Sequence, residues 1–282
     1  MIIHKTILAV IITIVLTAAP AARAAGVTMF PPPQKNISAE TLPYTQMLHA
    51  GAEEGVFYMR GRFATDFHFL GYNLDGDAPQ TILFGMSAAA HVNILPTSSM
   101  RFPIDNFYAT LALHFSGTIN PKLSWRLYPI HHVSAHLADG YPDDIMKEDV
   151  HAVSCEMTRG EIYYRPFGEI LELGAGAGWY YNTHAQKNLK YRADISILLT
   201  PAISTSNNAP NIQLKPFALL RLENVLQEKN NLGIDISAGA FSLNPAATRG
   251  LGLSLRYFNR LHSGYYFERY EKGWGAELMF LF

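Results

Sequence analysis

The stretch RLYPIHHVSAHLADGY, residues 126–141, carries the side chains with the clearest chemical potential. His132 and Ser134 stand two residues apart, and His136 and Asp139 follow closely. On a β-strand, residues i and i+2 point to the same face about 7 Å apart. Because a histidine that removes the hydroxyl proton activates serine as a nucleophile, this spacing is compatible with acyl-ester hydrolysis.

A His-x-Ser pair also needs a group that orients the imidazole and a donor that stabilises the oxyanion. Asp139, or Glu156 further along the chain, could orient His132. Metal binding fits less well, because His132 and His136 would lie about 13 Å apart on a strand. We therefore expect no metal site in this stretch.

The N-terminus has the pattern of a secretory signal peptide. His4 and Lys5 precede an apolar run, and small residues lead up to Ala24, as a signal-peptidase site requires. We expect residues 1–24 to be removed, and a retained anchor is the alternative. The apolar run is shorter than the ~20 residues of a spanning helix, and Pro20 interrupts it.

Beyond this segment, apolar residues alternate with small or polar ones. In FYATLALHFSG every second residue from Phe107 to Phe115 is apolar, and LELGAGAGWYYN repeats the pattern from Leu171 to Tyr181. A period of two is typical of strands with one apolar and one polar face. Segments rich in turn-forming residues separate the runs. The sequence therefore predicts an all-β protein.

The last ten residues, GWGAELMFLF, distinguish a membrane barrel from a soluble β-sandwich. Trp274, Ala276, Leu278, Phe280 and Phe282 share one face, and the chain ends on that face. This pattern resembles the C-terminal strand by which outer-membrane barrels are recognised for assembly. Tyrosines and phenylalanines near the strand ends match the aromatic girdles of such barrels. We predict a transmembrane antiparallel β-barrel in the outer membrane of a Gram-negative bacterium, with the barrel-assembly machinery as a partner of the Phe282 strand.

The number of alternating runs sets the size of the barrel. The expected strands span residues 57–70, 80–94, 104–117, 122–137, 150–165, 168–182, 190–203, 212–225, 230–243, 250–262 and 272–282. Because bacterial single-chain barrels have even strand numbers, we predict about 12 strands, with one more near the N-terminus, and 10 as the alternative. Residues 25–45 are expected to form a periplasmic lead-in, and residues 46–282 the barrel.

Unbroken alternation across residues 122–137 predicts which polar side chains enter the lumen. These are Arg126, Tyr128, His132, Ser134 and His136, together with Glu156 and the nearby Asp139. Large inward-facing residues would fill much of a narrow barrel; they are Tyr128, Tyr180, Phe241 and Phe258. The leading interpretation is a structural or narrow-pore, porin-like role, with a lumen network that includes Arg126, Tyr128, His136 and Asp139.

The alternative interpretation is an outer-membrane lipid acyl hydrolase. In it, Ser134 is the nucleophile, His132 the base and Glu156 the orienting carboxylate. An enzyme of this kind needs the pair to face lipid, whereas unbroken alternation directs it inward. A shift of one residue or a β-bulge in the strand would reverse that direction.

The opening stretch also carries a family resemblance. HVSAHLAD, residues 132–139, resembles the HQSSHLGDE signature of an uncharacterised family of bacterial outer-membrane proteins, known as domain of unknown function 1207. Gly140 replaces the acidic residue of that signature, whereas IDNFYATLALHFSGTINPKLSWRLY and SGYYFERYEKGWGAELMFLF are similar to the family. The resemblance implies an outer-membrane barrel and supplies no activity. The His-x-Ser pair more distantly resembles outer-membrane phospholipase A and lipid A deacylase barrels.

Composition limits the partners. With 22 basic and 23 acidic residues, the chain lacks the positive charge of a nucleic-acid binder. The single Cys155 cannot form an internal disulfide, and its apolar neighbours predict a buried or lipid-facing thiol. No cofactor is expected, although calcium could bind the external loop, and the expected partners are outer-membrane lipids and lipopolysaccharide. The acidic residues of that loop are Asp139, Asp143, Asp144, Glu148 and Asp149.

Overall fold

The computed structural model describes the strands and several of the turns that join them. The described residues are 27–31, 42, 46–53, 56–74, 80–94, 104–137, 153–184, 189–201, 213–227, 230–244, 249–261 and 270–281. The expected signal peptide, the acidic loop from Asp139 to Asp149, and Phe282 lie outside the described residues.

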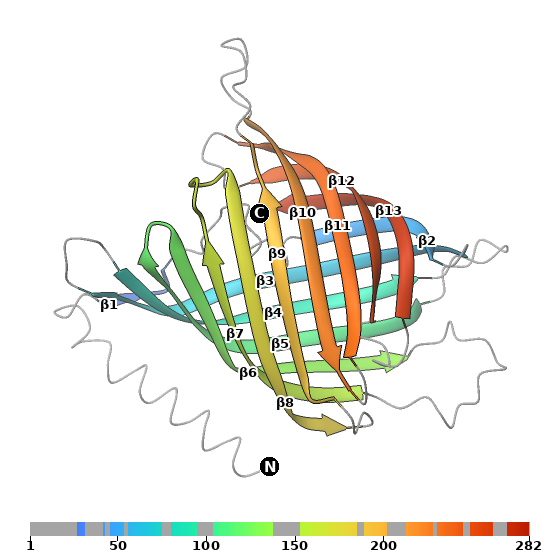
Figure 1. Ribbon diagram of the computed structural model, residues 1–282, viewed down its shortest axis with the longest axis horizontal. Coiled ribbons are helices and arrows are strands. Elements are labelled where there is room, and N and C mark those ends of the chain that lie inside the picture. Colours follow the sequence, from blue (N-terminus) through green and yellow to red (C-terminus); the bar gives the residue numbers. More distant parts are fainter. Residues whose placement is uncertain are drawn as a thin grey trace.

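Twelve antiparallel strands close into a barrel (Figure 1), which confirms the predicted fold. They are β2 (Gln46–Glu53), β3 (Val56–Leu74), β4 (Gln80–Ile94), β5 (Ile104–Asn120), β6 (Leu123–Leu137), β7 (Val153–Tyr164), β8 (Leu171–His184), β9 (Tyr191–Leu199), β10 (Gln213–Leu226), β11 (Asn230–Leu243), β12 (Gly250–Leu261) and β13 (Tyr270–Leu281). Strands β3 to β13 pair in chain order, and β2 completes the ring between β13 and β3.

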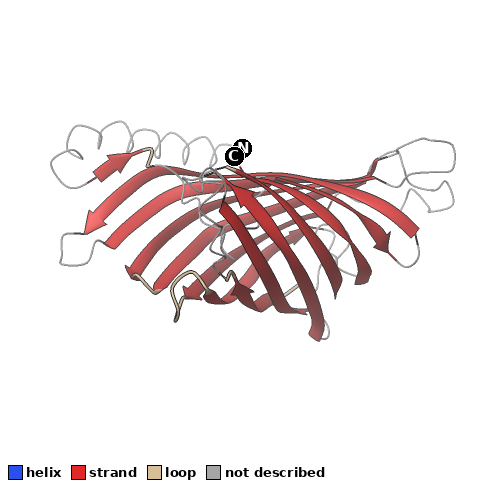
Figure 2. Cartoon of the chain, turned by 90° about the horizontal axis from the view of Figure 1, so that it is seen from above, coloured by secondary structure: helices blue, strands red, loops and turns tan. Residues whose placement is uncertain are grey.

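Strand β2 is the additional strand that the even-number rule required near the N-terminus. The short β1 (Val27–Met29) pairs with β3 outside the ring, with Val27 opposite Tyr72. Among the elements drawn in Figure 2 there are strands and loops only. No helix within the described ranges is both long and apolar enough to cross a membrane.

Side chains alternate between the outer face and the lumen, as the sequence predicted. In β13, Trp274 is 65% exposed whereas Glu271 and Glu277 are buried. In β5 and β8 the apolar residues face outward, including Leu111 and Trp179. The outer face is therefore largely apolar, and the polar side chains of these strands enter the lumen.

The lumen is filled in layers. An apolar cluster lies at the C-terminal end of the barrel, where β13 ends at Leu281, and a second lies at the opposite end, where β6 ends at Leu137. The first comprises Leu42, Met47, Tyr163, Leu198, Phe217, Phe241, Leu243 and Met279, and the second Val133, Cys155, Met157, Tyr180, Leu189, Val225 and Leu261. The predicted filling residues Tyr128, Tyr180, Phe241 and Phe258 are all buried.

Charged residues occupy the layer between the two clusters. Their ion pairs include Arg60–Glu271, Arg159–Glu161, Arg159–Asp194, Arg192–Glu223, Arg256–Asp235, Arg256–Glu277, Arg260–Asp235 and Arg260–Glu271. We call these residues the lumen charge layer. Most of these ion pairs join neighbouring strands, and Arg60–Glu271 joins β3 near the start of the barrel to β13 at its end.

Candidate active site

A β-bulge interrupts the middle of β6. Tyr128 pairs with Arg159 of β7 and His131 pairs with Met157, so Pro129 and Ile130 together oppose one residue, Thr158. Proline has no backbone N–H to donate to the ladder and is confined to edges and bulges within sheets. The Thr158 hydroxyl donates a hydrogen bond of 3.0 Å to the Pro129 carbonyl. The proline and this hydrogen bond account for the position of the bulge.

The bulge reverses the face of every residue that follows it. His132 pairs with Leu111 of β5 and Ser134 pairs with Ala109, and both β5 residues belong to the outward-facing series. Val133, which lies between them, is buried in the lumen at 6% exposure. The prediction that His132 and Ser134 point into the lumen is therefore wrong. One extra residue at the bulge turns both side chains to the outer face.

Glu156 also lies on the outer face, which corrects its predicted lumen position. Its neighbours Cys155 and Met157 are buried, and its side chain is 32% exposed. Its Oε1 lies 3.6 Å from Nδ1 of His132, its cross-strand partner. This distance is slightly longer than a hydrogen bond, and catalytic hydrogen bonds often tighten only when substrate is bound.

A second bulge brings Asn182 to the same carboxylate. Tyr180 pairs with Met157 and Asn182 with Glu156, so Tyr181 is the extra residue in β8. The Asn182 amide donates a hydrogen bond of 3.3 Å to Oε2 of Glu156. Glu156 is thus held between an imidazole and an amide. Uninterrupted alternation in β8 would have directed Asn182 into the lumen, and the bulge directs it to the outer face instead.

The surroundings of this group are polar at the centre and apolar around it. Ser154 is the cross-strand partner of Ser134. Phe107, Leu111, Ile130 and Tyr181 are between 38% and 50% exposed on nearby parts of β5, β6 and β8. We call Ser134, His132 and Glu156 the outer-face triad. These three residues carry the hydroxyl, imidazole and carboxylate groups that a serine hydrolase combines.

Only part of the predicted lumen network is found in the lumen. Arg126 and Tyr128 precede the bulge and are buried, with Arg126 Nη1 3.4 Å from the Tyr128 hydroxyl. The other guanidinium nitrogen, Nη2, donates to Asp66 Oδ2 at 2.9 Å. His136 pairs with Phe107 in the ladder, but its side chain and Asp139 lie outside the described residues.

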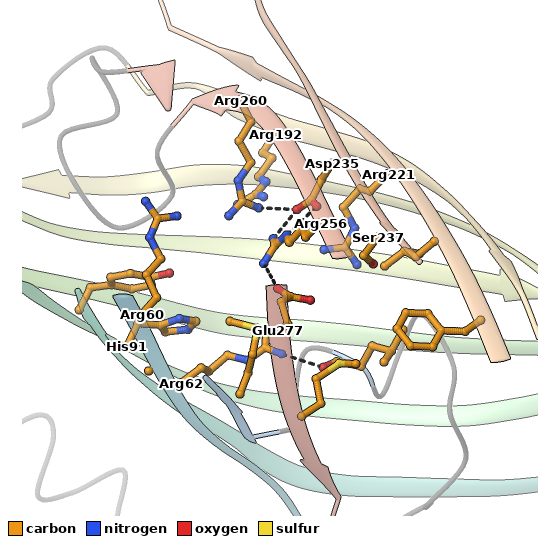
Figure 3. A pocket seen from close by; sticks show the side chains of 17 residues that line it. Arg60, Arg62, His91, Arg192, Arg221, Asp235, Ser237, Arg256, Arg260 and Glu277 are labelled. Atoms are coloured by element: carbon orange, nitrogen blue, oxygen red, sulfur yellow. Dashed lines mark hydrogen bonds and ion pairs between the residues drawn. The ribbon is translucent and has the colours of Figure 1, made fainter. Parts of the chain in front are cut away.

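A cavity of about 200 Å³ opens into the lumen charge layer. Figure 3 shows Arg256 between Asp235 and Glu277, with Arg260 bonded to the same aspartate. Arg256 Nη1 lies 2.9 Å from Glu277 Oε1, and its Nε lies 2.8 Å from Asp235 Oδ1. These carboxylates are engaged by arginines, which distinguishes them from Glu156.

The barrel is similar to solved outer-membrane proteins. The chain matches outer membrane phospholipase A from Escherichia coli with a TM-score of 0.53 and 11% identity, over 87% of this chain and 94% of that one. An active-site mutant of the same enzyme matches with a TM-score of 0.51 and 12% identity over the same shares. The β domain of the Bordetella autotransporter BrkA matches at 0.48 and 10% identity, over 84% of this chain and 97% of that domain.

The two likenesses with a TM-score above 0.5 define the fold class, that of outer-membrane β-barrels. No protein-family model matches the sequence, so the likeness to domain of unknown function 1207 rests on the quoted motifs alone. No curated protein sequence matches it either. The activity must therefore be argued from the site itself.

Proposed function

We propose that this protein is an outer-membrane lipid acyl hydrolase whose active site is the outer-face triad. The observation that carries the proposal is the bulge at Pro129 and Ile130, which turns His132 and Ser134 out of the lumen. There they join Glu156, which would otherwise be an isolated carboxylate on an apolar surface. An ionisable residue at such a position is costly, and a catalytic role explains why it is present.

Each residue has one role in the reaction. Ser134 Oγ attacks the ester carbonyl carbon while His132 accepts the hydroxyl proton, and Glu156 stabilises the imidazolium through Nδ1. The Ser154 hydroxyl, opposite Ser134 in the ladder, is positioned to donate a hydrogen bond to the oxyanion. The attack gives a tetrahedral intermediate. When it collapses, the ester C–O bond breaks and His132 gives its proton to the departing lipid alcohol. Water activated by His132 then hydrolyses the acyl-serine and releases a fatty acid.

The position of the triad indicates the substrate class. In barrels of this class the C-terminal strand ends at the periplasm and the longer loops face outward. The triad lies towards the opposite end, near the end of β6 and the start of β7, and so at the level of the outer leaflet. The apolar side chains around it would contact acyl chains. We infer that the substrates are acyl esters of outer-leaflet lipids, either phospholipid or the lipid A part of lipopolysaccharide.

The lumen supports a structural role more than a pore. Apolar clusters lie on both sides of the lumen charge layer, and the arginines and carboxylates between them are paired with one another. We infer that this filling holds the barrel rigid behind the triad. The buried Arg126 and Tyr128 of the predicted network therefore lie on the inner face of the barrel wall, and the proposed active site lies on its outer face.

The decisive test is lipid hydrolysis by purified protein in detergent micelles, with phospholipid and lipid A as separate substrates, with and without calcium. Ser134→Ala should lower fatty-acid release by roughly 10⁴-fold or more, because the activated nucleophile is lost. Ser242→Ala, an exposed serine of β11, is the matched control and should retain full activity. Equal turnover by wild type and Ser134→Ala, or no turnover of either lipid, would overturn the proposal.

A further inference from the structure

Three metal-ligating side chains meet inside the barrel, on the wall that carries the triad. Asp66 and His68 stand two residues apart on β3, and His114 extends inward from β5. Their potential ligand atoms all lie within 4.8 Å of one another. His114 Nε2 is 2.7 Å from Asp66 Oδ1, and the rings of His68 and His114 are nearly perpendicular, with centroids 5.3 Å apart.

The intervening strand leaves room for the two imidazoles. Gly85 of β4 is the ladder partner of both His68 and His114. A Cβ at this position would lie 2.9 Å from a ring carbon of His114 and 3.0 Å from one of His68. It would also clash with the Phe67 carbonyl oxygen, so any larger residue would displace the backbone of β3 as well as the rings. Glycine thus lets two histidines from non-adjacent strands approach each other.

Hydrogen bonds within the cluster do not account for the burial of the His68 imidazole. Its residue is only 2% exposed, yet neither ring nitrogen has a hydrogen-bond partner among the described residues. His114 is 0% exposed, and its Nδ1 also lacks a partner within the described part of the chain. A buried polar group without a partner is unfavourable. The arrangement therefore calls for a bound ion that accepts an electron pair from an imidazole nitrogen.

The geometry points to a binding site for one divalent transition-metal ion of the Zn²⁺ type, held by Asp66, His68 and His114. Two imidazoles and a carboxylate form a borderline donor set that suits Zn²⁺ better than Ca²⁺ or Mg²⁺, which prefer oxygen. Ligand atoms of a tetrahedral Zn²⁺ lie about 3.3 Å apart. Small rotations of the imidazoles would bring the three donors to that spacing and leave a fourth position for water.

Other residues hold the carboxylate in place. The Ser87 hydroxyl donates to Asp66 Oδ1 at 3.0 Å, and Arg126 Nη2 donates to Oδ2 at 2.9 Å. Such bonds to a ligating carboxylate orient it towards the ion. The ion would tie β3 to β5 across β4, next to the bulged strand β6. This site is independent of the acyl hydrolase, because it shares no residue with the outer-face triad.

The test is titration of metal-stripped, folded barrel with Zn²⁺, with Co²⁺ as a spectroscopic probe of coordination geometry. Wild type should bind one Zn²⁺ per chain, show Co²⁺ bands typical of tetrahedral coordination, and unfold at a higher temperature as Zn²⁺ is added. His68→Gln should lose all three responses. It should fold normally without metal, because His68 has no hydrogen bonds to lose among the described residues.

Matched variants separate this site from other histidines. His91→Gln removes a part-buried histidine of the lumen cavity that stacks on Tyr108 with ring centroids 4.0 Å apart, and the variant should bind Zn²⁺ as wild type does. Ser134→Ala should also bind normally, and Ser87→Ala should bind about 10-fold more weakly. Unchanged Zn²⁺ affinity in His68→Gln, or no saturable binding by wild type, would overturn the proposal.

Discussion

Glu156 on the outer face and Glu277 in the lumen each lie beside a histidine, but the two pairs differ in everything around them. Glu277 is 4% exposed and accepts hydrogen bonds from Ser254 at 2.8 Å and Arg256 at 2.9 Å. Its histidine, His49, is 3.4 Å away and also bonds to the Tyr58 hydroxyl at 2.7 Å. Every polar atom of this pair is committed to a structural partner.

The outer-face pair is less constrained. The Glu156 side chain is 32% exposed, and its contacts are His132 at 3.6 Å and Asn182 at 3.3 Å. His132 turns its Nδ1 towards Glu156, and Ser134 follows two residues later on the same face of β6. Under the proposed function, the outer-face pair is suited to catalysis because Ser134 shares its face of the strand, whereas both ring nitrogens of His49 in the lumen pair are bonded to structural partners.

The largest effect is expected when the carboxylate of the outer-face triad, Glu156, is replaced. Glu156→Gln should reduce lipid hydrolysis by about 10⁴-fold, because an amide no longer favours the required tautomer or stabilises the imidazolium. The unfolding temperature should change little, since the side chain is part-exposed. Glu169→Gln is the control: this carboxylate, in the turn after β7, is 67% exposed and pairs with Lys215. A loss of stability in Glu156→Gln without a loss of rate would make the pair structural.

The second prediction concerns the lumen charge layer. Arg256→Met should lower the free energy of unfolding by about 3 kcal/mol, because Asp235 and Glu277 both lose their ion pair with Arg256 while Arg260 stays beside Asp235. Denaturant-induced unfolding in detergent measures this change. The rate of hydrolysis per folded molecule should stay within a few-fold of wild type. A much larger drop in rate would mean that the lumen takes part in the chemistry.

The smallest effect is expected at the bulge itself. Thr158→Val removes the hydrogen bond to the Pro129 carbonyl and should cost about 1 kcal/mol of unfolding free energy. Because the bulge positions His132 and Ser134, hydrolysis should fall by about 10-fold even where the protein stays folded. Thr65→Val, at an exposed position of β3, is the matched control. Equal rates in the two variants would show that the bulge does not depend on this bond.

Much of the fold could be predicted because alternation is a local property. The series from Phe107 to Phe115 and from Leu171 to Tyr181 fixed the faces of β5 and most of β8, and the even-number rule indicated the strand that proved to be β2. The face of His132 and Ser134 could not be obtained by extending alternation from Arg126. A proline in mid-strand favours a bulge, so Pro129 was the available signal.

Other parts of the site depend on pairing between strands. Asn182 reaches Glu156 only because Tyr181 is an extra residue in β8, and that shift leaves no trace in the sequence pattern. Strand β4 and the two segments that connect it lie between His68 and His114 in the sequence, so the approach of the two histidines requires the strand pairing and the space above Gly85. Alternation within one strand can indicate that a histidine faces inward, but it cannot indicate that two histidines on different strands meet.

The bulge in β6 has an evolutionary consequence. Losing one codon between Tyr128 and His131 would restore the uninterrupted period of the strand and move His132 and Ser134 from the lipid surface into the lumen. No side chain of the outer-face triad need be substituted for such a barrel to gain or lose the proposed activity. Homologues with identical motifs but a different number of residues at this point would therefore divide into catalytic and non-catalytic lineages.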